Sequence, residues 1–239
     1  RCIYNVVNKS KKTVYLFISV FINIGILVLF KYYNFFIDSL VEFISLFGLN
    51  PNITSLQIIL PVGISFYTFQ TLSYSIDIYR EKIKPSNDII AFFAFVSFFP
   101  QLVAGPIERA SNLLPQLTKN RIFNYQQSVD AMRQILWGIF KKVVIADNCA
   151  VFTNHIFEHY QSHNGIMLIL GFVLFTFQIY ADFSAYSDIA IGVAKLLGIR
   201  LMQNFSTPYF SKNVAEFWRR WHISLSTWFR DYLYIPLGG

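Results

Sequence analysis

Ionisable and hydroxyl side chains are concentrated in one segment of an otherwise apolar sequence, FWRRWHISLSTWFRDYLYIPLGG, from Phe217 to Gly239. On a continuous helix, Arg219, His222 and Ser226 would share one face at the spacing i, i+3, i+7. A histidine in an apolar cavity can deprotonate an alcohol, and a rim of arginines can attract an anionic acyl donor. The alternative is a basic and aromatic belt at a membrane surface. Such a belt has no use for the hydroxyls of SLST, which favour a site of reaction.

Two carboxylates, Asp182 and Asp188, lie inside the apolar segment FQIYADFSAYSDIAIG, with Gln178 close by. A carboxylate at bilayer depth costs several kcal/mol unless it is paired or hydrated. Each aspartate could pair with an arginine of the C-terminal segment, or both could line a water-filled polar cavity beside a reaction centre. Both interpretations stay open. We expect these three residues to bind substrate or donor close to the reaction centre.

Three histidines, His155, His159 and His163, follow one another at a spacing of four residues. On a helix they would align, and imidazoles one turn apart can share a zinc ion. The asparagine, glutamine, serine and glycine around them are instead typical of a polar outer loop, which is our interpretation. Cys2 and Cys149 are far apart and form no CxxC motif. We therefore expect neither a metal site nor a disulfide framework.

The composition predicts a membrane protein. Hydrophobic residues make up 54% of the sequence and charged residues only 14%, whereas a soluble domain usually has about a quarter charged residues. The net charge of +7 could suggest nucleic acid, but residues 32–79 and 143–194 contain no lysine or arginine. Long cation-free runs between basic clusters are typical of positive-inside topology. We predict an all-α, polytopic transmembrane bundle that forms a single membrane-embedded domain over residues 1–239, and no nucleic-acid partner.

In the N-terminal half, the sequence predicts one membrane-spanning helix and three helical segments of other kinds. Thr13–Phe30 is apolar over ~27 Å at 1.5 Å per residue, enough to cross the hydrocarbon layer. Phe35–Leu49 carries two acidic residues four apart and resembles an interfacial amphipathic helix. Leu56–Tyr79 contains proline and glycine, and we expect it to face the protein interior. Ile89–Gly105 has basic flanks on both sides, which favours a re-entrant segment broken at Pro100.

The C-terminal half predicts a helix at Gln126–Ala146, whose two lysines can snorkel towards water. A second clear span is predicted at Gly165–Ala181, with helical periodicity continuing towards Leu197. The cation-free stretch Asp147–Asn164 between them would then lie outside the membrane as the polar loop that carries the three histidines.

Three blocks of the sequence resemble the membrane-bound O-acyltransferase family. They are FFPQLVAGPIERASNLLPQL, QIYADFSAYSDIAIGVAKLLGI and the C-terminal FWRRWHISLSTWFRDYLYIPLGG. The order of these blocks and the residues in them are similar to those of the branch of the family that includes the alginate O-acetylation protein. The similarity covers most of the chain from about Leu56 onward. The resemblance implies transfer of a short acyl group, usually acetyl, to hydroxyls of an extracytoplasmic polysaccharide through a tunnel across the membrane.

The resemblance also implies catalytic and binding roles. His222 matches the histidine of the family's WH block and would orient or deprotonate the acceptor. The family's second, more strictly kept histidine is expected beyond Gly239. We therefore expect this chain to be an internal fragment that is inactive alone. Arg219, Arg220 and Arg230 would line a cytoplasmic mouth, where a phosphate-bearing donor could dock.

The implied donor is acetyl-CoA or another acyl thioester, with no bound cofactor. The implied setting is the inner membrane of a bacterium, as a multi-pass protein that contacts the lipid bilayer. A polysaccharide or an extracytoplasmic acetyltransferase would be its partner. Two alternatives remain: D-alanyl transfer to teichoic acid, within the same family, and a membrane transporter whose aspartates relay ions. The ending YLYIPLGG resembles the alginate-type branch more than the D-alanyl branch.

The charge pattern generates a test of topology. Cysteine labels placed at Ser162 in a cysteine-free background should react with an impermeant reagent from the outside. Labels at Ser86 and Ser111 should react only after the inner face is exposed, because both lie in the basic, cytoplasmic stretches. Outside labelling of Ser111 would contradict the re-entrant interpretation of Ile89–Gly105.

Overall fold

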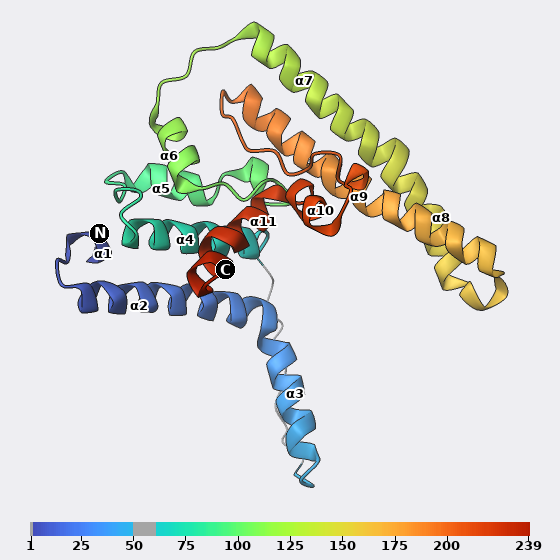
Figure 1. Cartoon of the computed structure of the whole chain (residues 1–239), viewed down its shortest axis with the longest axis horizontal. Helices are drawn as coiled ribbons and strands as arrows, with labels where there is room; N and C mark the ends of the chain where they lie inside the picture. The colour runs from blue at the N-terminus through green and yellow to red at the C-terminus, as the bar shows by residue number, and fades with distance from the viewer. Residues whose placement is uncertain (1, 50–60) are drawn as a thin grey trace. The chain divides into compact units, whose positions relative to one another are not determined.

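The computed structural model describes residues 2–49 and 61–239, and every regular element in these residues is helical (Figure 1). The all-α prediction is therefore confirmed for the described chain. The chain divides into two compact units, one ending at Ser97 and one running from Phe98 to Gly239. The first unit contains α1 (Cys2–Asn5), α2 (Lys9–Leu27), a π-helical segment (Val28–Tyr32), α3 (Tyr33–Ser45), α4 (Ile64–Tyr79) and α5 (Ile89–Val96). The second contains α6 (Ala110–Thr118), α7 (Tyr125–Phe140), a π-helical segment (Lys141–Ala146), α8 (Asp147–Glu158), α9 (Gly165–Leu196), α10 (Val214–Arg220), α11 (Ile223–Phe229) and a third π-helical segment (Arg230–Tyr234).

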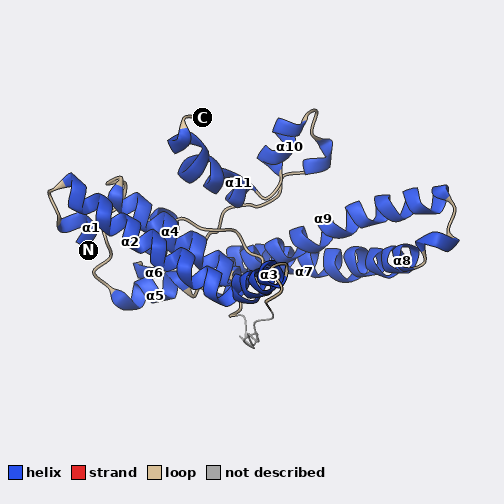
Figure 2. Cartoon of the chain, turned by 90° about the horizontal axis from the view of Figure 1, so that it is seen from below, coloured by secondary structure: helices blue, strands red, loops and turns tan. Residues whose placement is uncertain are grey.

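The first unit is built on the pairing of α2 with α4, which lie side by side in both views (Figures 1 and 2). Polar side chains join them along their length, including Ser19 Oγ to Ser75 Oγ at 2.8 Å and Thr71 Oγ1 to Asn23 Oδ1 at 2.5 Å. Helix α4 buries Gln70 and other polar residues. Its predicted orientation towards the protein interior is confirmed.

Two boundaries in this unit differ from the sequence expectations. The predicted interfacial helix is not separate, because α3 continues from α2 through the π-helical segment Val28–Tyr32. Tyr32 leaves the helical region at φ −120°, ψ 1°, and Figure 1 shows α3 turned away from α2 at that point. A π-bulge is a known cause of such a kink. Helix α4 begins only at Ile64, after Gly63 at φ 78°, and residues 56–60 of the expected helix lie outside the described residues.

The segment expected to break at Pro100 ends its helix earlier. Helix α5 stops at Val96, where the hydroxyl of Ser97 donates to the carbonyl of Phe93 at 2.7 Å. Pro100 lies in a separate 3-10 turn, Phe99–Gln101. The interruption is therefore confirmed, with its position corrected. Re-entry into a membrane stays a prediction.

The second unit is organised around a long antiparallel hairpin of helices. Helix α7, its π-helical segment and α8 run without a break and return along α9 (Figure 2). The predicted loop conformation at Asp147–Asn164 is therefore wrong over Asp147–Glu158, which form α8. The location of this segment outside the membrane stays a prediction. Helix α8 has polar residues on its outer face, but Thr153 and Ile156 are buried, and Ile156 packs beside Gly171 of α9. This packing against α9 stabilises the helix, and the polar composition of the segment gives no indication of it.

Glycines let α7 and α9 approach each other closely. A Cβ atom on Gly138 would lie 2.7 Å from Ile189 Cγ1 and 2.9 Å from the carbonyl oxygen of Ala185. A Cβ atom on Gly192 would lie 2.5 Å from Ile135 Cγ1. Small residues at helix contacts are how membrane helices gain close packing when no hydrophobic effect drives them together.

Within residues 2–49 and 61–239, two helical runs are long and apolar enough to cross a membrane, Lys9–Ser45 and Gly165–Leu196. They contain the two predicted spans. In the most apolar part of Lys9–Ser45, none of the residues is buried inside the protein. In the corresponding part of Gly165–Leu196, 11% of the residues are buried. Such exposure suits helices whose solvent is lipid.

The close packing of α7 on α9 yields a stability test. Gly138→Leu and Gly192→Leu should each lower the free energy of unfolding by about 1–3 kcal/mol, the usual cost of overpacking. Gly25→Leu is the matched control, because nothing lies within 4 Å of a Cβ atom at Gly25 in α2. Thermal unfolding of the full-length protein in detergent measures the difference, and equal melting of all three variants would contradict the close approach.

Candidate active site

The segment that carries His222 is not the continuous helix that the sequence predicts. Helix α10 ends at Arg220 and α11 begins at Ile223, while His222 between them has φ 42°, ψ 55° in the left-handed region. Arg219, His222 and Ser226 therefore do not share one helical face. The hydroxyl of Ser226 instead donates to the carbonyl of Trp221 at 3.1 Å and helps to close the turn.

Tertiary contacts hold this break in place. The extended segment before α10 runs beside it, so that Ser206 N–H donates to the carbonyl of Arg220 at 3.0 Å and Ile223 N–H donates to the carbonyl of Asn204 at 2.9 Å. Trp221 adds ring contacts, at 5.1 Å from Phe205 between centroids. A non-glycine residue in the left-handed region costs about 1–3 kcal/mol and persists only where its surroundings impose it.

The imidazole of His222 is partly buried and uncharged. Its ring meets Phe183 of α9 edge to face, with centroids 4.7 Å apart. Its Nε2 atom is buried and has no hydrogen-bond partner among the described residues. Burial lowers the pKa of His222 to about 4, so the ring is neutral at pH 7. A neutral, buried ring nitrogen without a partner can accept a proton or a hydrogen bond from a hydroxyl group.

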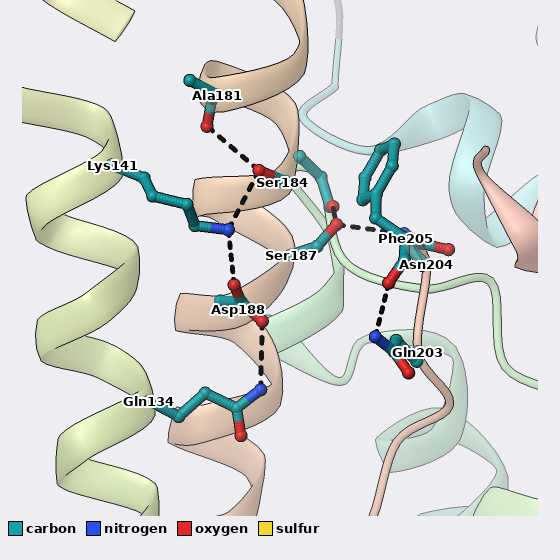
Figure 3. Close-up of polar contacts among 10 residues, drawn as sticks. Gln134, Lys141, Ala181, Ser184, Ser187, Asp188, Gln203, Asn204 and Phe205 are labelled. Carbon is teal, nitrogen blue, oxygen red and sulfur yellow. Dashed lines mark hydrogen bonds and ion pairs between the residues drawn. The ribbon is translucent and has the colours of Figure 1, made fainter. Parts of the chain in front are cut away.

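A second polar group lies between α7 and α9 (Figure 3). The Lys141 ammonium lies 2.5 Å from Asp188 Oδ2 and 2.9 Å from Ser184 Oγ. Gln134 Nε2 donates to the other oxygen of Asp188 at 3.1 Å. Lys141 is buried at 8% exposure. A charged pair in such surroundings is stable only when each member satisfies the other.

The partners of the two aspartates are lysines of the neighbouring helical run. Lys142 contacts Asp182 and Asp147 at 2.7 Å each. The pairing with C-terminal arginines, one of the two interpretations of the sequence, is thus corrected. A signal for the lysines was present, because two adjacent cations in the apolar run WGIFKKVVIA are as costly in a membrane as the aspartates.

A cavity of about 790 Å³ opens beside the Lys141–Asp188 pair. Its walls come from α7 and the π-helical segment after it, from α9 and from residues 203–210, and aromatic and aliphatic side chains alternate there with polar ones. Asp188 and Asn204 line it, whereas Gln178, Asp182 and His222 are not among its lining residues. The structure thus places one of the predicted aspartates at the wall of a cavity that has both polar and apolar lining.

The three predicted arginines are each held by a neighbour in their own part of the chain. Arg219 Nε donates to the carbonyl of Ala215 at 3.2 Å. Arg220 lies 2.5 Å from Glu216 Oε1. Arg230 lies 2.8 Å from Asp231 and is 60% exposed. Their role in donor binding stays a prediction.

The block around GPIERASNLLPQL supports the extended segment that precedes α10. Gln116 accepts from the backbone N–H of Arg200 at 2.8 Å and donates to its carbonyl at 3.0 Å. The buried carboxyl of Glu108 accepts from Met202 N–H and from Asn112 at 2.6 Å, and burial raises its pKa. These residues, which the sequence analysis did not single out, fix the position of the chain leading to Asn204.

The same block reaches the C-terminal segment directly. Arg109 lies 3.5 Å from Asp231 and 4.5 Å above the ring of Tyr232. The block and the C-terminal segment, far apart in sequence, are therefore in contact within the second unit.

The three histidines of the hairpin come together, although not as a loop. His155 lies in α8, His159 ends that helix, and His163 follows a short 3-10 turn. The ring of His155 is 4.8 Å from that of His159 and 5.9 Å from that of His163. In the described part of the chain, no group of three or more histidine, cysteine or acidic residues is arranged to hold a metal ion.

Comparison with known proteins identifies related sequences. Residues 80–239 match the model of MBOAT, the membrane-bound O-acyltransferase family. The chain is 45% identical over 225 residues to "Probable alginate O-acetylase AlgI" of Pseudomonas aeruginosa, covering 94% of this chain and 43% of that protein. It is 38% identical over 256 residues to the peptidoglycan O-acetyltransferase of Helicobacter pylori, covering 95% and 47%. It is 28% identical over 183 residues to the teichoic acid D-alanyltransferase of Bacillus subtilis, covering 73% and 45%. The chain thus spans less than half the length of these relatives.

The ion pairs generate a ranking of aspartate variants. In the full-length protein, Asp188→Leu should reduce stability and activity more than Asp182→Leu, because Lys142 keeps Asp147 as a second partner. Both should be more harmful than Asp38→Leu, at an exposed position of α3. Removing one partner of a fully buried pair costs about 3–5 kcal/mol, and the partial exposure of Asp188 makes the loss smaller.

The double variant Lys141→Leu/Asp188→Leu should regain part of the lost stability, since it removes the uncompensated ammonium. Membrane protein level and thermal unfolding in detergent measure both effects. Equal behaviour of Asp188→Leu and Asp38→Leu would show that the pair does not stabilise the hairpin.

Proposed function

Because this chain belongs to the membrane-bound O-acyltransferase family, we propose that it is part of a membrane enzyme that transfers an acyl group to hydroxyl groups. We propose acetyl as the acyl group and an extracytoplasmic, alginate-type polysaccharide as the acceptor. The relatives named as O-acetylases or O-acetyltransferases support this choice with 38–46% identity, against 28–31% for those named as D-alanyltransferases. D-alanyl transfer to teichoic acid is the second candidate.

The donor in this proposal is acetyl-CoA or another acyl thioester that arrives from the cytoplasmic side, with no resident cofactor. The setting is a bacterial inner membrane, and the polysaccharide or an extracytoplasmic acetyltransferase is the partner. Arg219, Arg220 and Arg230 would attract the phosphates of the donor. A transporter function has less support, because Lys141 and Gln134 occupy both carboxyl oxygens of Asp188, the aspartate that lines the cavity.

One observation carries the chemical part of the proposal: the neutral, partly buried imidazole of His222, whose Nε2 atom is buried and without a partner in the described chain. In the proposed step, the acceptor hydroxyl oxygen attacks the thioester carbonyl while its proton passes to a histidine nitrogen. The carbon–sulfur bond then breaks, and the thiolate leaves and takes up a proton. The family resemblance implies a second histidine on a later helix, so the step is assigned to the longer protein.

The proposal is tested with His222→Ala and His222→Gln in the full-length enzyme. Loss of general acid–base help should lower the acetylation rate ~10²–10⁴-fold in His222→Ala while the protein remains inserted. Glutamine should restore part of the rate if His222 orients the acceptor, and none if it transfers the proton. His155→Ala is the matched control, at an exposed position of α8. Polymer-bound acetyl per unit of membrane protein is the readout, and normal acetylation by His222→Ala would remove this residue from the site.

The pH profile provides an independent check on the same residue. Because burial lowers the pKa of His222 to about 4, the ring stays neutral and able to accept a proton throughout the neutral range. The wild-type rate should therefore be level above about pH 6 and fall only as the pH approaches that pKa. Comparison with His222→Gln identifies the contribution of the histidine to the profile. A wild-type midpoint near pH 6.5 that disappears in His222→Gln would contradict the lowering of the His222 pKa by burial.

A further inference from the structure

We infer that Asn204 is a positioning residue of the acyl-transfer site, holding the turn of His222 against α9. This inference rests on the proposed function, because it assigns a role to Asn204 only in relation to His222. Asn204 belongs to none of the three sequence blocks that carry the family resemblance. It lies in the extended segment between α9 and α10 and is fully buried, at 0% exposure.

Each polar group on the Asn204 side chain has one specific partner. Its Oδ1 atom accepts from the backbone N–H of Ser224 at 3.4 Å. Its Nδ2 atom donates to the hydroxyl of Ser187 at 3.1 Å (Figure 3). The hydroxyl of Ser187 in turn donates to the carbonyl of Ala104 at 3.1 Å. The backbone carbonyl of Asn204 accepts from Ile223 N–H at 2.9 Å.

These bonds join the three blocks at one point. Ala104 belongs to FFPQLVAGPIERASNLLPQL, Ser187 to the α9 block, and Ser224 to the C-terminal block. The amide accepts from Ser224 through one atom and donates to Ser187 through another, whereas a carboxylate accepts only and an aliphatic side chain does neither. Asparagine therefore satisfies both partners at this position.

The bonds to Ile223 and Ser224 act on the two residues that follow His222 directly. The left-handed conformation of His222 is unfavourable by itself and must be imposed by its neighbours. The Asn204 carbonyl and side chain capture the first two N–H groups of α11 and so set where that helix begins. Its start fixes the conformation of His222 and thereby directs the imidazole towards Phe183 of α9.

Asn204 also links the turn to the cavity beside Lys141 and Asp188. It lines that cavity, whereas His222 is not among the lining residues. The side chain that positions the histidine is thus part of the cavity wall. We assign it a positioning role and not a catalytic one, because its hydrogen bonds run to the protein itself.

The test is a double-mutant cycle in the full-length enzyme. Asn204→Ala should lower the turnover number about 10²-fold, the loss that a misplacement of about 1 Å can produce, with little change in KM. In the His222→Ala background the same substitution should have almost no further effect, because residues that act as one unit are not additive. Asn148→Ala, at an exposed position of α8, is the matched control and should retain full activity.

Ser187→Ala provides a second, milder variant in case Asn204→Ala accumulates poorly. This substitution removes only the Ser187 hydroxyl that accepts from the Asn204 amide. It should therefore lower turnover less than Asn204→Ala does, and it should have no effect in the His222→Ala background. Full activity of Asn204→Ala beside an inactive His222→Ala would overturn this inference alone. Equal further losses from Asn204→Ala in both backgrounds would also overturn it, since they indicate a merely structural role. Full activity of His222→Ala would overturn the proposed role of His222 and the positioning role with it.

Discussion

The ion pair between Lys141 and Asp188 is the constraint on which the second unit depends. Both charges lie in segments that are otherwise apolar, and neither is stable there without the other. They meet because α7 and α9 approach closely at Gly138 and Gly192, where any side chain would collide with the facing helix. The pair thus fixes the register of the long hairpin. The hairpin in turn supplies two walls of the cavity and the surface of α9 on which the histidine turn rests.

The second feature is a strained turn at His222 that its surroundings maintain. The aromatic rings around Trp221 and the bonds from the segment 204–206 stabilise a conformation that the isolated segment would avoid. Such local strain is common where a side chain must point in a direction that a regular helix does not offer. Here it turns the imidazole towards Phe183 of α9, where partial burial keeps the ring neutral.

The two features meet on one helix. On α9, Asp188 and Ser184 hold the lysine, Ser187 holds Asn204, and Phe183 packs on the histidine ring. Hydrogen bonds with partners at fixed distances on several elements keep a site rigid, which is what acyl transfer between two bound substrates requires.

The sequence alone determined the class of the protein. Its charge deficit and apolar runs predicted a helical membrane protein, and the three blocks carried the resemblance to a family that the comparisons then showed. Local patterns also placed the two long apolar helices and the burial of α4. These features depend on composition and periodicity within one segment, which can be read without knowing what packs beside it.

Only the tertiary structure decided which residues meet. Asp182 and Asp188 required partners, but the choice of lysines followed from the packing of α7 on α9. Directly after the break at His222, the N–H groups of Ile223 and Ser224 donate to Asn204, about twenty residues earlier in a segment without any helical or motif signal. Helix α8 extends through a polar stretch because two of its residues are buried in the hairpin. Each of these outcomes is set by contacts between distant segments, and local sequence does not contain the energy of such contacts.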